Sequence, residues 1–160
     1  MKDVVIQTKL HACKLEELTD EQRELVAIAK EQTNNSYCPY SKFHVGAAAK
    51  LENGLIIRGS NQENAAYPSG ICAERSALFA AGANYPEVPV STLCIACFTE
   101  GHFTETPGAP CGACRQVMLE TEHRYGKPMQ VILYGENETY VFDSAADLLP
   151  VGFFAEDLVK

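Results

Sequence analysis

The sequence predicts an α/β fold in which one β-sheet lies between layers of helices. Three observations indicate this class: an amphipathic helix with a capping signal comes first, two β-type segments joined by a tight turn follow it, and strand-like and helix-like segments then alternate. The chain has 160 residues, a length typical of one domain with a sizeable core. We therefore expect a single domain over residues 1–160.

Four helical segments are expected. Thr19 can form a capping box with Gln22, and apolar residues follow at helical spacing. Pro110 introduces a later helix, and Gly126 and Pro128 end it. The expected helices run from Thr19 to Asn34 and over residues 72–81, 111–125 and 144–149, the last with Asp143 as its cap.

The β-type segments number about five. Asn53-Gly54 is a strong hairpin signal because both residues tolerate a positive φ. The run 92–98 is continuously apolar and is expected to be a buried strand. The expected strands cover residues 43–51, 55–57, 92–98, 129–134 and 139–142. Residues 100–109 form a loop directly before the third helix.

Composition and charge exclude several classes of protein. Apolar residues make up 46% and charged residues 21% of the chain, which is an ordinary globular balance. The formal net charge of −8 argues against nucleic acid as a partner, because nucleic-acid binding needs a basic surface. No uninterrupted apolar run reaches the roughly 18 residues of a membrane span. We expect a cytoplasmic protein, in which the seven cysteines are reduced.

The spacing C-x-x-C occurs twice, at Cys94/Cys97 and at Cys111/Cys114. Residues three apart on a strand point to opposite faces of a sheet, whereas residues three apart on a helix share one face. Cys111 and Cys114 can therefore hold one metal ion together, and Cys94 and Cys97 are expected in the core. An alternative remains open, in which all four cysteines form a non-enzymatic zinc-binding module.

Cys72 is the third candidate ligand because it begins the other Ala-rich helix, where the helix dipole favours a thiolate. Three protein ligands leave the fourth tetrahedral position of zinc free, which is typical of a catalytic site. Glu74 follows two residues later and diverges from Cys72 by roughly 200° around a helix. It is a candidate general acid and base beside the metal.

Cys72-Ala73-Glu74 followed by Pro110-Cys111-Gly112-Ala113-Cys114 resembles the zinc deaminase signature of Cys or His-x-Glu, then Pro-Cys-x-x-Cys. Cys at the first position is similar to the small nucleoside cytidine deaminases. The resemblance extends from about Leu18 to the end through three further blocks, which are residues 40–48, residues 59–68, and Leu148-Leu149-Pro150 with Phe153 and Glu156-Asp157-Leu158. It implies a three-layer α/β/α fold and leaves residues 1–17 as an N-terminal extension.

The resemblance also implies roles for individual residues. Cys72, Cys111 and Cys114 would bind Zn2+, and Glu74 would transfer protons during hydrolysis of cytidine or deoxycytidine to uridine or deoxyuridine and ammonia. Asn61 and Glu63 match residues that bind the ribose hydroxyls. Phe43 and Val45 match residues that line the base and sugar pocket. The backbone amide of Ala73 matches a contact with the pyrimidine carbonyl. Tyr67 and Phe153 match residues that reach a neighbouring subunit in a homotetramer.

Three thiolates and one zinc ion sum to one negative charge, so a nearby cation is needed to preserve the acidity of the metal. Arg75 and Arg115 are the candidates, and the resemblance favours Arg75.

A second activity within the class, deamination of another cytosine nucleoside such as an antibiotic, is not excluded by the motifs. Three features depart from the family: residues 1–17, the long loop 100–109, and Ser60 where relatives often have cysteine.

Overall fold

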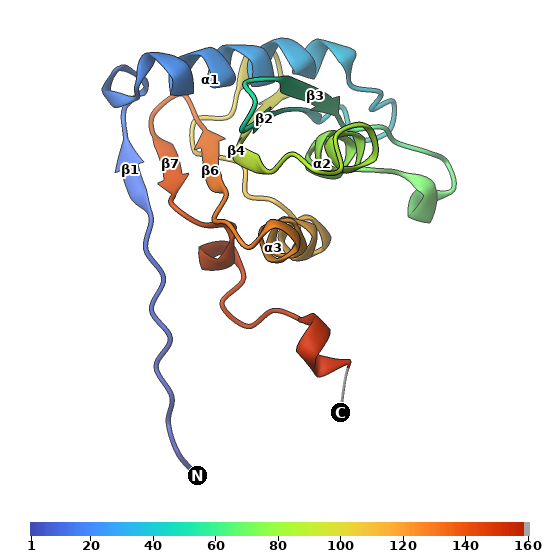
Figure 1. The fold of residues 1–160 in the computed structure, drawn as a ribbon. Helices are drawn as coiled ribbons and strands as arrows, with labels where there is room; N and C mark the ends of the chain where they lie inside the picture. Colours follow the sequence, from blue (N-terminus) through green and yellow to red (C-terminus); the bar gives the residue numbers. More distant parts are fainter. Residues whose placement is uncertain (159–160) are drawn as a thin grey trace.

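A mixed sheet forms the middle layer of the computed structural model, which describes residues 1–158 (Figure 1). The strand order is β1-β7-β6-β4-β2-β3, and β5 pairs with β4. β4 and β6 are parallel, and the other neighbouring pairs are antiparallel. The strands are β1 (His11–Cys13), β2 (His44–Leu51), β3 (Ile56–Ser60), β4 (Val90–Thr99), β5 (His102–Phe103), β6 (Gln130–Tyr134) and β7 (Thr139–Phe142).

Three α-helices cover the two faces of this sheet. They are α1 (Asp20–Gln32), α2 (Ala73–Asn84) and α3 (Gly112–Tyr125). Figure 1 shows α1 on one face and α2 and α3 on the other, which confirms the three-layer α/β/α arrangement. The capping box of Thr19 and Gln22 begins α1, as the sequence predicts. None of the helices in residues 1–158 has the length and apolar character that a membrane span requires.

Alternation along the strands builds a separate core on each face of the sheet. In β2, Ala47, Ala49 and Leu51 are fully buried against α2 and α3, whereas Ala48 is buried on the face covered by α1. β4 divides in the same way, with Leu93 and Ile95 facing α2 and α3. Small side chains in β2 allow both helix layers to lie close to the sheet.

The sheet has seven strands, so the expected number of about five was wrong. All five predicted strands are present within two or three residues of their expected ends. The two additional strands are β1, with three residues, and β5, with two. Strands this short have no detectable periodicity. β1 pairs with β7, and β5 pairs with Phe98 and Thr99 at the end of β4, beyond the residues that pair with β6.

Two smaller expectations also change. The predicted helix over residues 144–149 is a 3-10 helix, Ala145–Leu148. Its cap is the hydroxyl of Ser144, which accepts from the amide of Ala146, and not Asp143. The segment is further held by Glu122 on α3, whose carboxylate accepts from Ser144 and from the amides of Ala145 and Ala146. A long-range partner of this kind is invisible in local sequence.

Two glycines in the sheet set the distance to the helices. A Cβ on Gly46 would collide with the carbonyl oxygen of Ala29 on α1. A Cβ on Gly59 would lie 2.5 Å from the carbonyl oxygen of Ala73 and 2.7 Å from the amide nitrogen of Ala77, both on α2. The first turn of α2 therefore lies directly on β3, at the position of Gly59.

We predict that Gly59→Ala lowers the free energy of unfolding by about 2–3 kcal/mol, because α2 must shift to accept the methyl group. The melting temperature should fall by about 5–10 °C in calorimetry. Gly82→Ala is the matched control, since Gly82 lies within α2 and an added Cβ meets only the end of the Arg124 side chain, at 3.0 Å. That variant should be neutral or slightly more stable. Equal destabilisation of both variants would contradict the close approach at Gly59.

Candidate active site

Two helix N-termini meet at one edge of the sheet. β3, β4 and β6 run in the same direction, because β2 is antiparallel to both β3 and β4 and β4 is parallel to β6. α2 follows β3, and α3 follows β4 after the short strand β5. Both helices begin near the carboxyl ends of β3 and β4, where α/β proteins place their sites. Cys72 is the N-cap of α2 and Cys111 is the N-cap of α3.

The three cysteines predicted as ligands lie together at this point. The Sγ atoms of Cys72 and Cys111 are 3.8 Å apart, and those of Cys111 and Cys114 are 3.4 Å apart. All three Sγ atoms lie within 4.8 Å of one another. A zinc ion with tetrahedral Zn–S bonds of about 2.3 Å requires sulfur atoms about 3.8 Å apart. The three thiols therefore fit a zinc ion in spacing and in chemistry.

Charges near the thiols favour ionisation of Cys72. The neighbouring Cys114 thiol stabilises a thiolate at Cys72, and the Arg75 guanidinium donates a hydrogen bond to it, with the NH2 nitrogen 3.7 Å from Sγ. Together they lower the pKa of Cys72 to about 5, whereas that of Cys114 is raised because it holds the shared proton. The buried Nε of Arg75 has no hydrogen-bond partner within residues 1–158. The contact of its NH2 nitrogen with Cys72 places the Arg75 guanidinium beside the thiols, as the resemblance implies.

Arg115, the other candidate cation, has a structural role. Its guanidinium group donates to the carbonyl oxygens of Pro110 and Leu148 at 2.9 and 3.0 Å. These bonds join the start of α3 to the C-terminal segment. Arg115 is therefore committed to the backbone, which agrees with the preference for Arg75.

Glu74 is buried in the first turn of α2, with 4% of its surface exposed. Burial raises the pKa of its carboxyl, and the negative charge on Cys72 raises it further. A carboxyl group of this kind takes and releases protons more readily near neutral pH than an exposed one. Glu74 is thus suited to acid and base chemistry beside the thiols.

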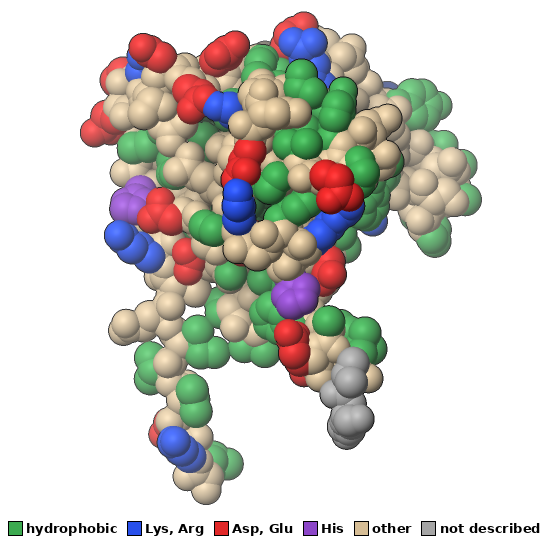
Figure 2. Space-filling view, in the orientation of Figure 1, with side chains coloured by type: hydrophobic (Ala, Val, Ile, Leu, Met, Phe, Trp, Pro, Cys, Tyr) green, Lys and Arg blue, Asp and Glu red, His purple; other side chains and the backbone are tan. Residues whose placement is uncertain are grey.

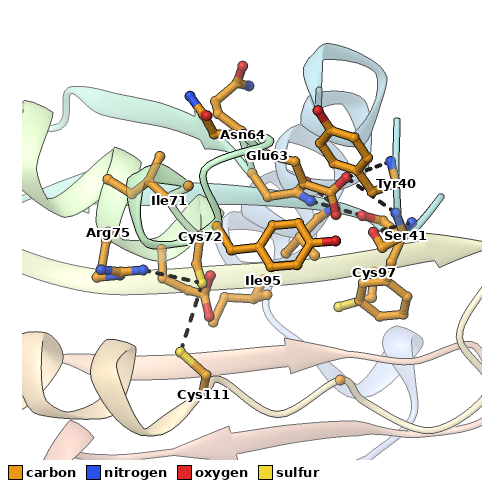
Figure 3. A pocket seen from close by; sticks show the side chains of 18 of the residues that line it. Tyr40, Ser41, Glu63, Asn64, Ile71, Cys72, Arg75, Ile95, Cys97 and Cys111 are labelled. Carbon is orange, nitrogen blue, oxygen red and sulfur yellow. Dashed lines mark hydrogen bonds between the residues drawn. The ribbon is translucent and has the colours of Figure 1, made fainter. Parts of the chain in front are cut away.

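A cavity of about 910 Å³ opens beside Glu74, Cys72 and Cys111. Figure 3 shows Cys72, Cys111 and Arg75 toward one end of this cavity, and Glu63 with Tyr40 and Ser41 toward the other. Ile95 lies between the two groups. The cavity therefore has a reactive end with thiols and a polar end with a carboxylate, joined by apolar side chains.

The polar end is organised by backbone hydrogen bonds. The Glu63 carboxylate accepts from the amides of Tyr40 and Ser41 at 2.9 and 3.3 Å. The Ser41 hydroxyl and these two amides lower the pKa of Glu63, so it is an anion at neutral pH. The Asn61 side chain bridges two backbone groups, accepting from the amide of Val45 at 2.8 Å and donating to the carbonyl of Phe43 at 2.9 Å. Asn61 therefore holds the start of β2 in place.

The structure places the other predicted site residues in two groups. Phe43, Val45 and Tyr67 line the cavity together with Asn61 and Glu63. Ala73 does not line it, because this first residue of α2 has its side chain fully buried in the core between α2 and the sheet. Phe153 lies on the C-terminal segment outside the cavity, with 54% of its surface exposed.

Cys94 and Cys97 separate as the strand geometry predicts. Cys94 lies in the core under α1, whereas Cys97 belongs to the core on the opposite face. Burial raises the pKa of both thiols, that of Cys97 to about 12. Cys97 also lines the cavity, next to Gly108. Its position in the pocket was missed, because an apolar strand gives no sign of which face lies beneath a cavity.

Sequence reasoning missed several other lining residues. The cavity is also lined by Ile71 and by Gly108 and Ala109 of the loop before α3. The Pro110-Cys111 sequence marks where the loop ends but not which residues of the loop face the pocket. Tyr40 and Ser41 belong to a block that was identified by resemblance, yet no role followed from it.

A family model described as the cytidine and deoxycytidylate deaminase zinc-binding region matches residues 19–125. The chain belongs to this family. The curated cytidine deaminase of Halalkalibacterium halodurans is 40% identical over 84% of this chain and 95% of its own length. That of Sporosarcina psychrophila is also 40% identical, over 84% of this chain and 93% of its own length.

Solved structures of other members of the deaminase family share the fold. A cytidine deaminase from Burkholderia pseudomallei has a TM-score of 0.68 and 40% identity, and covers 85% of this chain and 100% of its own. One from Mycobacterium tuberculosis has a TM-score of 0.64 and 30% identity, and covers 85% of this chain and 98% of its own. The family is a zinc-binding one, so the zinc predicted from the cysteine pattern agrees with both the comparison and the thiol geometry.

We predict that Cys72→Ser, Cys111→Ser and Cys114→Ser each retain less than about a tenth of the zinc bound by the unchanged protein, because a hydroxyl replaces a thiolate ligand. Cys94→Ser is the matched control, since its thiol lies on the other face of the sheet. It should keep about one zinc per chain. Elemental analysis after dialysis measures both. Loss of zinc from Cys94→Ser would instead support the four-cysteine module.

Proposed function

We propose that this chain catalyses the hydrolytic deamination of cytidine and deoxycytidine to uridine and deoxyuridine, with release of ammonia. The observation that carries the proposal is the buried carboxyl of Glu74 beside three clustered thiols, at the reactive end of a cavity with a carboxylate at its other end. The curated relatives are named as cytidine deaminases, which supports the same reaction. Loss of cytidine absorbance on addition of the protein tests it directly.

Cys72, Cys111 and Cys114 would hold the zinc ion. When bound, the ion lowers the pKa of a water molecule enough to provide hydroxide near neutral pH. Arg75 lies beside the Cys72 sulfur and offsets part of the negative charge of three thiolates. Without that cation the electron-rich sulfurs would weaken the effect of the metal.

Glu74 would move the two protons that the reaction needs. Its carboxylate accepts a proton from the attacking water and delivers it to N3 of the pyrimidine, which makes C4 electrophilic. Hydroxide then adds to C4, and Glu74 would carry the proton of the new C4 hydroxyl to the exocyclic amine. The C4–N bond breaks, ammonia leaves, and the C4 oxygen remains as the carbonyl. A raised pKa suits both halves of this cycle, because the group must accept and release protons at the same pH.

The other end of the cavity would bind the sugar. Glu63 is an anion held by two backbone amides, so its free lone pairs can accept from ribose hydroxyls. Asn61 is already bonded to Phe43 and Val45, and we assign it a positioning role in addition to any contact with the sugar. Phe43 and Val45 would pack on the nucleoside, and the amide of Ala73, at the first turn of α2, would contact the pyrimidine carbonyl.

We further propose that the working enzyme is a homotetramer in the cytoplasm. Phe153 is held through its backbone, which exchanges two hydrogen bonds with the Gln116 side chain at 2.7 and 3.1 Å, while the residue remains 54% exposed. Tyr67 on the cavity rim is 77% exposed. In the proposed tetramer both exposed rings would contact a neighbouring subunit. The thiolate ligands must be reduced to bind metal, which agrees with a reducing compartment.

We predict that Glu74→Gln loses at least about 10³-fold in kcat, because the amide cannot accept the proton from water. Its zinc content and its affinity for cytidine should be retained, since the shape of the site is unchanged. Spectrophotometric turnover, metal analysis and calorimetric titration measure the three quantities. Turnover within tenfold of the unchanged protein would falsify the role of Glu74.

We predict that Glu63→Gln lowers kcat/KM for cytidine by about tenfold or more, because a sugar hydroxyl loses its charged acceptor. Free cytosine, which has no sugar, should be a very poor substrate for both proteins at an unchanged rate. Comparing the two substrates separates sugar binding from general damage to the site. An equal loss with cytosine and cytidine would show that Glu63 does not act through the sugar.

A further inference from the structure

The first ten residues form an extended arm that leaves the body of the molecule. Figure 1 shows the arm continuing the line of β1 and projecting from the same side of the molecule as the C-terminal segment. Every residue of the arm is exposed. Ten extended residues span about 33 Å, which is long enough to reach far beyond the chain to which they belong.

The arm is apolar for a segment so exposed. Val4, Val5, Ile6 and Leu10 are 74, 83, 54 and 44% exposed, and Figure 2 shows hydrophobic side chains on both projecting segments. Within residues 1–158 the arm pairs with no strand, because β7 ends at Phe142, opposite the residue before His11. Its backbone donors and acceptors are available to a strand from outside the chain.

The order of residues in the arm is complementary to itself. Antiparallel pairing of two arms about Ile6 places Ile6 opposite Ile6 and Val4 opposite Thr8. The same register places Asp3 of each arm opposite Lys9 of the other, so two opposite-charge pairs form. Alternation then collects Val4, Ile6 and Leu10 on one face of the ribbon, together with Lys2 and Thr8 near its ends. The other face has Asp3, Val5, Gln7 and Lys9.

We propose that residues 1–10 bind a second copy of this chain by forming an antiparallel two-stranded ribbon centred on Ile6. The face with Val4, Ile6 and Leu10 packs between the two bodies, beside the exposed Val151 and Leu158 of the C-terminal segments. An isolated two-stranded ribbon is only marginally stable in water, and this apolar cover supplies the missing burial. The contact is isologous, as in a two-fold dimer.

Charge and comparison both favour a second copy as the occupant. The arm has two lysines and one aspartate, and in this register Asp3 of each arm lies opposite Lys9 of the other, so charge favours this pairing of two arms. The Burkholderia pseudomallei deaminase is covered completely while 15% of this chain remains unmatched, and the family match begins at residue 19. The arm is thus an addition to the deaminase domain, and the proposal does not depend on the reaction.

Disulfide trapping in the full-length protein tests the pairing. Ile6→Cys places two thiols opposite each other, at a Cα separation of about 5 Å that a disulfide accepts. With oxidised glutathione as the oxidant, we expect it to give about tenfold more covalent dimer on a denaturing gel than Gln7→Cys. Gln7→Cys is the matched control, because this register offsets its two copies by about 7 Å along the ribbon. The unchanged protein measures the background from the native cysteines.

Charge reversal then tests the register. Asp3→Lys in the Ile6→Cys background sets lysine opposite lysine twice and should lower the dimer yield about fivefold. Adding Lys9→Asp restores opposite charges and should restore the yield. Equal trapping of Ile6→Cys and Gln7→Cys, trapping no higher than background, or failure of the double reversal to recover would each overturn the proposed ribbon. Cytidine turnover, unchanged in all these variants, confirms that they are folded.

Discussion

The meeting of two helix N-termini on one face of the sheet is the constraint on which the site depends. Each N-terminus offers unpaired amides and a positive dipole end, and a cysteine occupies the cap of each helix. The third thiol, Cys114, lies one turn into α3 and is fully buried. Because β3, β4 and β6 run in the same direction, the two helices begin at the same edge. The metal-binding geometry therefore follows from the topology of the sheet.

The same arrangement explains why Glu74 can be buried. A carboxylate in the core normally costs several kcal/mol, but here it lies in the first turn of α2, where the dipole favours negative charge. Close contact between Gly59 and the backbone of Ala73 and Ala77 holds this turn against β3. Burial and the neighbouring thiolate still raise the pKa of Glu74. In the first turn of α2, the Glu74 carboxyl can therefore be buried in the site and still exchange protons.

Much of this could be predicted from residues and spacing. The opposite orientation of Cys94 and Cys97 followed from strand geometry alone, and the clustering of Cys111 with Cys114 followed from helical spacing. Cys72 was proposed from its position at the start of an Ala-rich helix, and the resemblance then supported it, because nothing in local sequence joins residues 39 positions apart. β1 and β5 were missed because two or three residues carry no periodicity, and Cys97 was assigned only to the core because burial and pocket lining look alike in an apolar strand. Glu122 was missed for a similar reason, since its partners are distant in sequence.

The segment before α3 contacts both faces of the sheet before it reaches the site. Phe103 in β5 packs on Phe98 and Tyr134, with ring centroids 5.2 and 5.8 Å apart, on the face covered by α1. The loop then crosses the end of β4 and reaches the other face, where Gly108 lies so close to the Cys97 sulfur that a Cβ would be only 2.5 Å from it. Pro110 and Cys111 follow immediately. The packing of Phe103 on one face and the contact of Gly108 with Cys97 on the other therefore determine how the chain enters α3. The position of the Cys111 thiol depends on both contacts.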